Sequence, residues 1–515
     1  MTTARYLSVL AMFAIGALSA SAVNAADKPA TAKAAAGPAG AAAPATTPAA
    51  AAPAPSARTP SSAPAAPAAV TAPAAATAPP AGAAAPAETI VLRATRLFDS
   101  TSNTLRTDAT IVVRGDRIVS VGKASVPAGA RVIDLGDATL MPGFIDAHTH
   151  ITMELESNYY HYAYNGLLRF QSETALYAAL YAKRTLEAGF TTIRNVGAEE
   201  FVDVGLRNAI NAGVAEGPHI LTAVHAIGST GGHCDRAPFP PEHVKPIGPI
   251  EGVCNGVNEC REAVRDQLKW GADVIKICAS GGVLSESDPV DVPQLTLDEL
   301  TAIVSEAHKW KRKVAAHAHG DAAARLAIEA GVDSIEHGTF LTDDTLKLMK
   351  SKGVYLVPTR LASYWVNKMA DTYPPQIAAK ARLAYASAEK SFRAAVKIGV
   401  LIAFGTDSGV SPHGMNALEF GLMADAGMPP ANAVLAGTRD AAKLLGVDAD
   451  VGTLQAGKVA DVVAVAGDVL KNIRSTEHPV FVMHLGHVVL QKAGFCSGPG
   501  CPAGPSAPPA VSASH

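Results

Sequence analysis

The chain has 515 residues, a formal net charge of −3 and 48% hydrophobic residues, and its length gives room for two or three domains. Its 43 Lys and Arg residues form no basic cluster beside the 46 Asp and Glu residues, which argues against nucleic acid as the main partner. Beyond residue 25 the sequence contains no run of about 20 apolar residues, so we expect no membrane span in the mature protein.

Residues 1–25 have the pattern of a secretory signal peptide. Arg5 supplies a positive start, residues 6–22 are apolar, and Val23 and Ala25 place small residues before a cleavage site at Ala26. A membrane anchor is the alternative interpretation. We expect an exported protein that is periplasmic or secreted.

Residues 26–87 are almost entirely Ala, Pro, Thr, Ser and Gly, a composition that buries too little apolar surface to fold. We therefore predict a disordered linker there and a flexible tail over residues 494–515. In an exported protein some of the six cysteines can pair. Cys254 lies near Cys260 and Cys496 near Cys501, but sequence alone does not determine the pairing.

Short β-strand patterns separated by Gly and Asp turns occur near both ends of the ordered region. The first set covers residues 88–142, and a similar set returns over residues 446–493. The simplest arrangement is one small composite β-sandwich domain built from both segments, with residues 143–445 inserted as a larger domain.

The inserted region alternates apolar strand-like runs with helical segments, which predicts a (β/α)8 TIM barrel of the α/β class. In such barrels the active site lies at the carboxyl ends of the strands. The eight predicted strands cover residues 144–150, 191–196, 219–227, 272–280, 313–319, 332–337, 354–359 and 401–407.

Metal-ligand residue types stand at the ends of several of these strands. They are His148, His150, His317, His337 and Asp407. Residues two apart on a strand point to the same face, so both His148 and His150 can reach one ion. Imidazole suits zinc and similar metals. A hydrogen-bonded pair of core histidines is the alternative for His148 and His150 alone, but the whole set predicts one metal centre assembled by folding.

Lys276 lies on the fourth predicted strand and is an unusual member of this set. A protonated lysine would be repelled by divalent cations. One interpretation of Lys276 involves no metal: a lysine in the barrel interior that pairs with a carboxylate.

From about Glu88 to Gln491 the chain resembles the amidohydrolase superfamily, in its two-metal subtype with a carboxylated lysine. Within it the chain is similar to the imidazolonepropionase-like branch, which includes Xaa-Pro dipeptidases (prolidases) and ochratoxin-hydrolysing amidohydrolases. The pieces that carry the resemblance are MPGFIDAHTH, HAIGSTGGHCD, VIKICASGG, AAHAHG, SIEHG, FGTDSG and GTLQAGKVADVV.

The resemblance implies a role for each ligand. His148, His150 and Asp407 would hold one divalent ion and His317 and His337 a second, with zinc as the default metal. Lys276, as N6-carboxylysine, and a hydroxide would bridge the two ions. Asp407 would shuttle the proton of that hydroxide to the leaving amine. Relatives also suggest a homo-oligomer.

Four further residues are candidates for contact with the substrate or the centre. His225 and His233 follow the third predicted strand, where either could donate to a developing oxyanion or to a substrate carboxylate; a loop-structuring role is the alternative. Arg360 follows the seventh and could pair with a substrate carboxylate, or form a surface salt bridge. For His319, contact with the ligand residues is favoured over direct binding of the metal.

The sequence thus predicts a metal-dependent amidohydrolase that cleaves the amide bond of dipeptides or N-acyl amino acids, with dipeptidase or carboxypeptidase character and a small-molecule or dipeptide substrate. An ochratoxin-type amide is one candidate. The alternative enzyme is a cyclic amide, imidazolone or lactone hydrolase on the same two-metal site. A third hypothesis is an envelope-associated binding protein whose barrel has lost its activity.

Overall fold

The computed structural model describes residues 88–123, 125–156, 158–235, 242, 246–286 and 288–494. The predicted signal peptide, the linker up to residue 87 and the tail from residue 495, with Cys496 and Cys501, lie outside the described residues. Within the described part of the chain, no helix is both long enough and apolar enough to cross a membrane.

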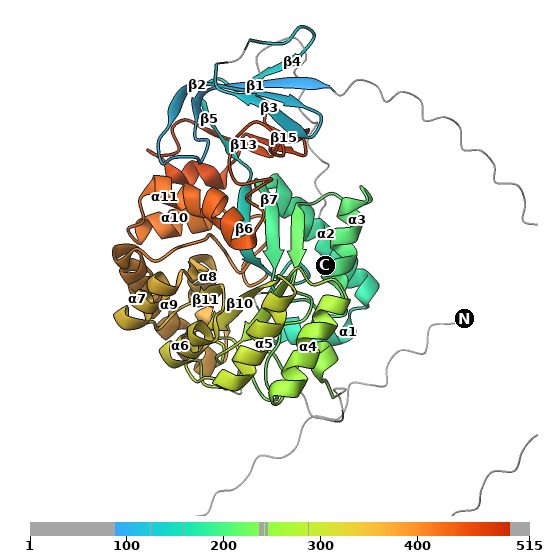
Figure 1. The fold of residues 1–515 in the computed structure, drawn as a ribbon, viewed down its shortest axis with the longest axis vertical. Coiled ribbons are helices and arrows are strands. Elements are labelled where there is room, and N and C mark those ends of the chain that lie inside the picture. The colour runs from blue at the N-terminus through green and yellow to red at the C-terminus, as the bar shows by residue number, and fades with distance from the viewer. Residues whose placement is uncertain are drawn as a thin grey trace, which may run out of the picture. The chain divides into compact units, whose positions relative to one another are not determined.

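Strands from both ends of the described chain form one eight-stranded sheet (Figure 1). Its order is β15-β14-β13-β5-β1-β2-β3, with β4 paired to β1. The strands are β1 (Thr89–Leu97), β2 (Arg106–Arg114), β3 (Arg117–Val121), β4 (Arg131–Asp134), β5 (Ala138–Pro142), β13 (Val462–Ala466), β14 (Phe481–His484) and β15 (His487–Gln491).

The two halves of this sheet meet where β5 runs antiparallel to β13, in a register that pairs Pro142 with Val462. Apolar side chains of both halves share one core, for example Leu92, Leu140 and Phe481. The composite β domain predicted from the sequence is therefore confirmed.

The inserted region forms the predicted (β/α)8 barrel. Its regular strands pair in parallel in two groups, β6-β7-β8 and β9-β10-β11-β12. They are β6 (Phe144–Thr149), β7 (Phe190–Asn195), β8 (His219–Thr222), β9 (Val274–Cys278), β10 (Lys313–Ala318), β11 (Ser334–His337) and β12 (Tyr355–Val357).

Isolated parallel bridges close the ring of strands. Ile227 bridges Ile277, which joins the segment after β8 to β9. The eighth predicted strand, residues 401–407, forms no continuous ladder and is held by single bridges, from Ile402 to Leu356 of β12 and from Ser408 to Thr149 of β6. The third and eighth strands are therefore less regular than the sequence predicted.

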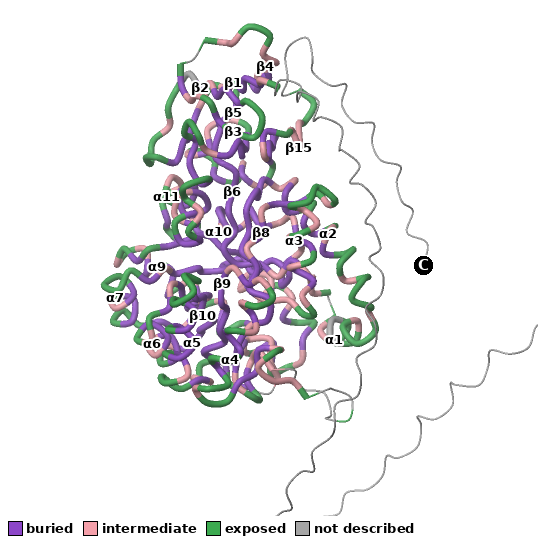
Figure 2. Tube along the Cα trace, turned by 45° about the vertical axis from the view of Figure 1, so that its right-hand side comes forward, coloured by how far each residue is buried: buried purple, intermediate pink, exposed green. Residues whose placement is uncertain are grey.

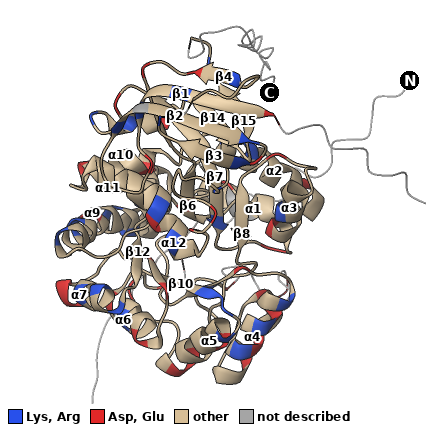
Figure 3. Cartoon of the chain, turned by 45° about the horizontal axis from the view of Figure 1, so that its top comes forward, with Lys and Arg blue, Asp and Glu red and all other residues tan. Residues whose placement is uncertain are grey.

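Helices cover the outside of the barrel, and the interior strands are buried (Figure 2). Lys and Arg lie among Asp and Glu on helices such as α4 and α7 (Figure 3). The helices that enclose the strands are α1 (Tyr159–Leu168), α2 (Gln171–Glu187), α3 (Val202–Asn211), α4 (Val257–Lys269), α5 (Leu297–Lys309), α6 (Asp321–Ala330), α7 (Asp343–Lys352), α8 (Arg360–Lys368), α9 (Pro375–Ile398), α10 (Leu418–Asp425), α11 (Pro430–Leu435) and α12 (Ala441–Leu445).

The local sequence explains where several of these helices begin and end. Thr296 and Glu299 form a capping box at the start of α5. Gly331 and Gly353 end α6 and α7 in the left-handed conformation that glycine adopts without strain.

Two disulfides are present among the described residues. Cys254 pairs with Cys260, six residues further along the chain. Cys234 pairs with Cys278, which ties the loop after β8 to the end of β9. The second pairing joins two segments that carry predicted site residues, His233 and Lys276.

Candidate metal centre

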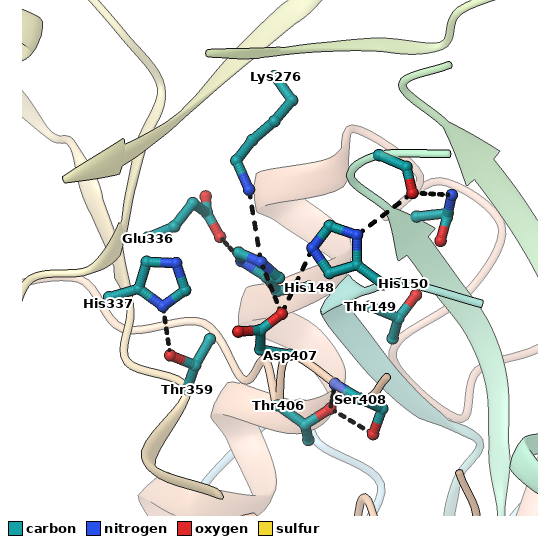
Figure 4. Close-up of polar contacts among 12 residues, drawn as sticks. His148, Thr149, His150, Lys276, Glu336, His337, Thr359, Thr406, Asp407 and Ser408 are labelled. Atoms are coloured by element: carbon teal, nitrogen blue, oxygen red, sulfur yellow. Dashed lines mark hydrogen bonds and ion pairs between the residues drawn. The ribbon is translucent and has the colours of Figure 1, made fainter. Parts of the chain in front are cut away.

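The predicted ligands converge at the carboxyl ends of the barrel strands. Figure 4 shows five of them, His148, His150, Lys276, His337 and Asp407. Potential ligand atoms of His148, His337 and Asp407 lie within 4.8 Å of one another, and so do those of His317, His319 and His337. His337 belongs to both groups, so the two groups are adjacent.

Each predicted histidine ligand has one ring nitrogen engaged by a neighbour that is not itself a predicted ligand. Such a contact fixes the ring and determines which nitrogen can present a lone pair. The contacts are His148 Nδ1 to Glu336 Oε2 at 2.7 Å, His150 Nδ1 to Gly197 O at 3.2 Å, His317 Nε2 to Gly281 O at 3.1 Å, and His337 Nδ1 to Thr359 Oγ1 at 2.7 Å.

Burial keeps three of these rings, those of His150, His317 and His337, in the neutral form that binds metals. It lowers the pKa of His150 to about 3 and holds the pKa values of His317 and His337 well below the ordinary value. The imidazoles are therefore ready to act as ligands at neutral pH.

Asp407 presents a buried carboxylate oxygen toward two of these rings. Its Oδ1 lies 3.4 Å from Nε2 of His148 and 3.4 Å from Nε2 of His150. Among the described residues, no donor forms a hydrogen bond with this oxygen. A buried charged oxygen without a donor is costly, and a cation held between it and the two ring nitrogens would remove that cost. This donor set fits a divalent metal ion.

Backbone strain accompanies the ligand positions. His337 has a φ of 71° and Asp407 a φ of 59°, values that place non-glycine residues in the left-handed region. The segment before Asp407 is fixed by Asp146 of β6, which accepts from Thr406 Oγ1 at 2.6 Å and from Asn416 Nδ2 at 2.8 Å. Gly405 lets the same segment pack closely against β12, because a Cβ at position 405 would lie 2.3 Å from Val357.

Lys276 extends into the same cluster. Its Nζ lies 3.4 Å from Nε2 of His148, and burial lowers the pKa of its amino group to about 8, against the opposing effect of Glu336 and Asp407. A larger fraction of this amine is thus neutral near physiological pH than for an exposed lysine. A neutral amine is the form that can react with carbon dioxide.

Glu336 contacts the predicted ligand His148 and pairs with Arg194. The sequence analysis identified neither Glu336 nor Arg194. Glu336 accepts from Arg194 Nη2 at 2.8 Å and from Ser334 Oγ at 2.5 Å, while its second oxygen contacts His148. Burial opposes ionisation, but Arg194 and His148 outweigh it and hold the pKa of Glu336 at about 2. The available sequence signal was an acidic residue inside an apolar strand, next to His337.

The two candidate histidines after β8 lie on different sides of the centre. His225 contacts Gln267 Oε1 through Nδ1 at 3.0 Å and lines a cavity of about 250 Å³ together with His150. The ring of His233 stacks on that of His317 with centroids 4.4 Å apart, and its Nδ1 contacts Ser285 Oγ at 2.5 Å.

His233 is held close to the chain that follows β9. A Cβ at Gly282 would lie 2.2 Å from the His233 ring, so only glycine leaves room for it. The Cys234–Cys278 disulfide fixes the adjacent residue to the end of β9.

Of the two remaining candidates, His319 lies in the ligand cluster and Arg360 does not. His319 groups with His317 and His337, and its Nδ1 contacts Thr339 Oγ1 at 2.7 Å. Arg360 is buried at the start of α8, where its Nη2 lies 3.3 Å from Glu389 of α9. No hydrogen bond or ion pair among the described residues joins Arg360 to a predicted ligand, so the structure does not bring it into the cluster.

Comparison with known proteins identifies the family. Residues 139–489 match the model of the amidohydrolase family. This chain belongs to that family. The assignment made from the sequence motifs is confirmed.

The amidohydrolase resembles several characterised relatives. It is 33% identical to ochratoxinase from Aspergillus niger over 362 residues, which cover 67% of this chain and 74% of the relative. A solved Xaa-Pro dipeptidase with bound methionine is 37% identical, with a TM-score of 0.75 over 78% of this chain and 99% of that one. Imidazolonepropionase from Cutibacterium acnes is 27% identical over 378 residues, or 70% of this chain and 84% of the relative.

The position of Glu336 in this amidohydrolase leads to a prediction. Glu336→Gln removes the charge that orients His148 and leaves Arg194 without its carboxylate, so metal affinity should fall by about 10- to 100-fold. Competition with a chelator of known affinity measures this change. Glu306→Gln is the control, because Glu306 also pairs with an arginine, Arg265 at 2.9 Å, but on the outer helix α5. Equal affinities in the two variants would contradict the supporting role of Glu336.

Proposed function

We propose that this amidohydrolase cleaves the amide bond of dipeptides or N-acyl amino acids and releases the C-terminal amino acid. The observation that carries the proposal is the buried Asp407 oxygen facing His148 and His150, with the Lys276 amine beside them. The names of the Xaa-Pro dipeptidase and of ochratoxinase support an amide substrate, and make an ochratoxin-type amide a candidate.

We further propose that the centre holds two divalent ions, with zinc as the default. His148, His150 and Asp407 would hold one ion, and His317 and His337 the other. Lys276, carboxylated on its amino group, would reach both. Support comes from the two adjacent ligand groups, which share His337, and from the short distance between Lys276 and His148. When bound, such ions lower the pKa of a water molecule and polarise the scissile carbonyl.

Asp407 is the proposed proton carrier. With its Oδ1 facing His148 and His150, where an ion would be held, its other carboxylate oxygen would accept the proton of the attacking water. The same oxygen then donates this proton to the leaving amine, which departs as a neutral amino group. No covalent intermediate with the protein is required.

His225 and His233 are the proposed donors to the developing oxyanion or to a substrate carboxylate. His225 lines the small cavity beside His150, and His233 stacks on His317, so each is close to one ligand group. Arg360 remains a proposed carboxylate partner only through its Nε and Nη1, which have no hydrogen-bond partner among the described residues.

A substrate screen tests the reaction class. We expect turnover of N-acyl amino acids and dipeptides, with C-terminal Pro, Phe, Arg and an ochratoxin-type amide as the variable set, and loss of turnover after metal chelation. Asp407→Asn, assayed in parallel, measures contaminating hydrolases. Turnover of lactones or imidazolones without any amide cleavage would overturn the proposal in favour of a cyclic-substrate hydrolase, which the resemblance to imidazolonepropionase supports.

An exported location is part of the proposal. Disulfides persist mainly in oxidising compartments, and the Cys234–Cys278 and Cys254–Cys260 pairs support export. Cell fractionation with an antibody against the protein tests it, and recovery of the mature chain in the cytoplasm would contradict it.

A further inference from the structure

A second cluster of metal-ligand residue types lies away from the catalytic centre. It consists of His219, Asp461 and His484, whose potential ligand atoms lie within 4.8 Å of one another. His219 is the first residue of β8, whereas the catalytic ligands lie at the carboxyl ends of the barrel strands. Asp461 immediately precedes β13 and His484 ends β14, so the cluster joins the barrel to the composite sheet.

The three side chains are already arranged around a common point. Nδ1 of His484 lies 2.9 Å from Oδ1 of Asp461, and the rings of His219 and His484 meet edge to face with centroids 4.8 Å apart. Asp461 is 4% exposed and His484 7% exposed. The cluster is therefore largely withdrawn from water.

Asp461 has charge that its surroundings do not fully compensate. Its Oδ1 also accepts from the backbone N–H of Leu485 at 2.9 Å, but no described residue forms a hydrogen bond with Oδ2. No Lys or Arg within the described ranges forms an ion pair with Asp461. Burying a carboxylate in this way is costly unless a cation completes the site.

His219 contributes a second imidazole beside this carboxylate, with a ring nitrogen within 4.8 Å of the potential ligand atoms of Asp461 and His484. Imidazole and carboxylate groups suit zinc and similar metals.

One residue of the cluster borders a cavity. His219 lines a cavity of about 990 Å³ at the amino ends of β8, β9 and β10. Asp450 and Leu485 line the same cavity, and Leu485 directly follows His484. Water in this cavity can supply the remaining position of an ion held by three protein ligands.

We propose that His219, Asp461 and His484 bind one divalent cation of the zinc class, at a structural site separate from the catalytic centre. The ion would link the start of β8 to β13 and β14, and so fasten the barrel to the composite sheet. Two imidazoles and one carboxylate are ligands that zinc accepts in proteins.

Counting zinc in matched variants tests the proposal. The chelator-treated protein is dialysed against zinc in slight molar excess, and bound zinc is measured by elemental analysis. His219→Gln and His484→Gln should each bind one equivalent less than the unmodified protein and keep its rate of amide turnover. His308→Gln should bind the full amount, because His308 also lies 2.9 Å from an aspartate, Asp333, but belongs to no group of three ligands found among the described residues. Equal zinc in all four proteins would overturn the proposal.

A second measurement does not depend on the folding of the His219 and His484 variants. The double variant His148→Ala/His317→Ala removes one proposed ligand of each catalytic ion but leaves the junction cluster intact. It should still bind one zinc per chain, and this zinc should raise its melting temperature. Absence of bound zinc in the folded double variant would overturn the structural site, whereas loss of its activity concerns only the catalytic centre.

Discussion

Lys276→Met is expected to remove most of the amide turnover together with bound metal. Methionine nearly matches the length of lysine and fills the same buried space, but it has no amine that carbon dioxide can modify. Loss of a residue that only supports a metal ligand typically weakens metal binding by about 10- to 100-fold. Loss of a group proposed to reach both ions should therefore lower activity by more than about 100-fold. Turnover rate and metal content, measured on one preparation, check this expectation.

Lys276→Ala provides the matched comparison, because alanine leaves empty the space that methionine fills. A small carboxylate such as formate or acetate, added to the Ala variant, can occupy that space and supply the missing oxygens. We expect partial recovery of metal and activity in the Ala variant and none in the Met variant. Near-wild-type turnover of Lys276→Met would refute a bridging carboxylate and favour a lysine that pairs with Glu336 or Asp407.

Asp407→Asn should lower kcat by roughly 10²- to 10⁴-fold, the usual contribution of a positioned acid–base group, with a much smaller change in KM. The amide has the same shape as the carboxylate and keeps one oxygen toward His148 and His150, but it cannot carry the proton between water and the leaving amine. Steady-state kinetics on the best amide substrate of the screen check the separation of kcat from KM.

Metal content distinguishes the two roles of Asp407. If the asparagine variant keeps the full metal content and loses kcat, the proton-transfer role is supported. Asp333→Asn is the control, because Asp333 is a partly buried aspartate that pairs with His308 and Lys313 at the amino ends of the barrel strands. A kcat within tenfold of wild type in Asp407→Asn would exclude Asp407 as the proton carrier.

The sequence predicted the barrel and the convergence of the ligands because both depend on local periodicity. Strands that alternate with helices pair in parallel, and parallel pairing brings all carboxyl ends to one edge. His148, His317 and Asp407 could therefore be grouped without knowledge of distances. The eighth strand was harder to predict in detail, since residues 401–407 are held by isolated bridges rather than by a ladder.

Interactions between non-adjacent strands could not be read from the sequence. The ion pair between Arg194 of β7 and Glu336 of β11 depends on which side chains face each other across the barrel interior. The Cys234–Cys278 disulfide likewise requires the loop after β8 to return to β9. Arg360 has the expected position after β12, but the start of α8 directs its guanidinium toward Glu389 of α9.

The composite sheet cannot complete its strand pairing until β13 has been synthesised. β1 to β5 are made first, yet the strand that covers the edge of β5 is β13, which follows the entire barrel in the chain. Until β13 emerges, β5 presents unpaired backbone groups to any other extended segment. The earliest strands to be synthesised thus belong to a domain that is finished last, and an interrupted chain would be open to strand exchange at β5.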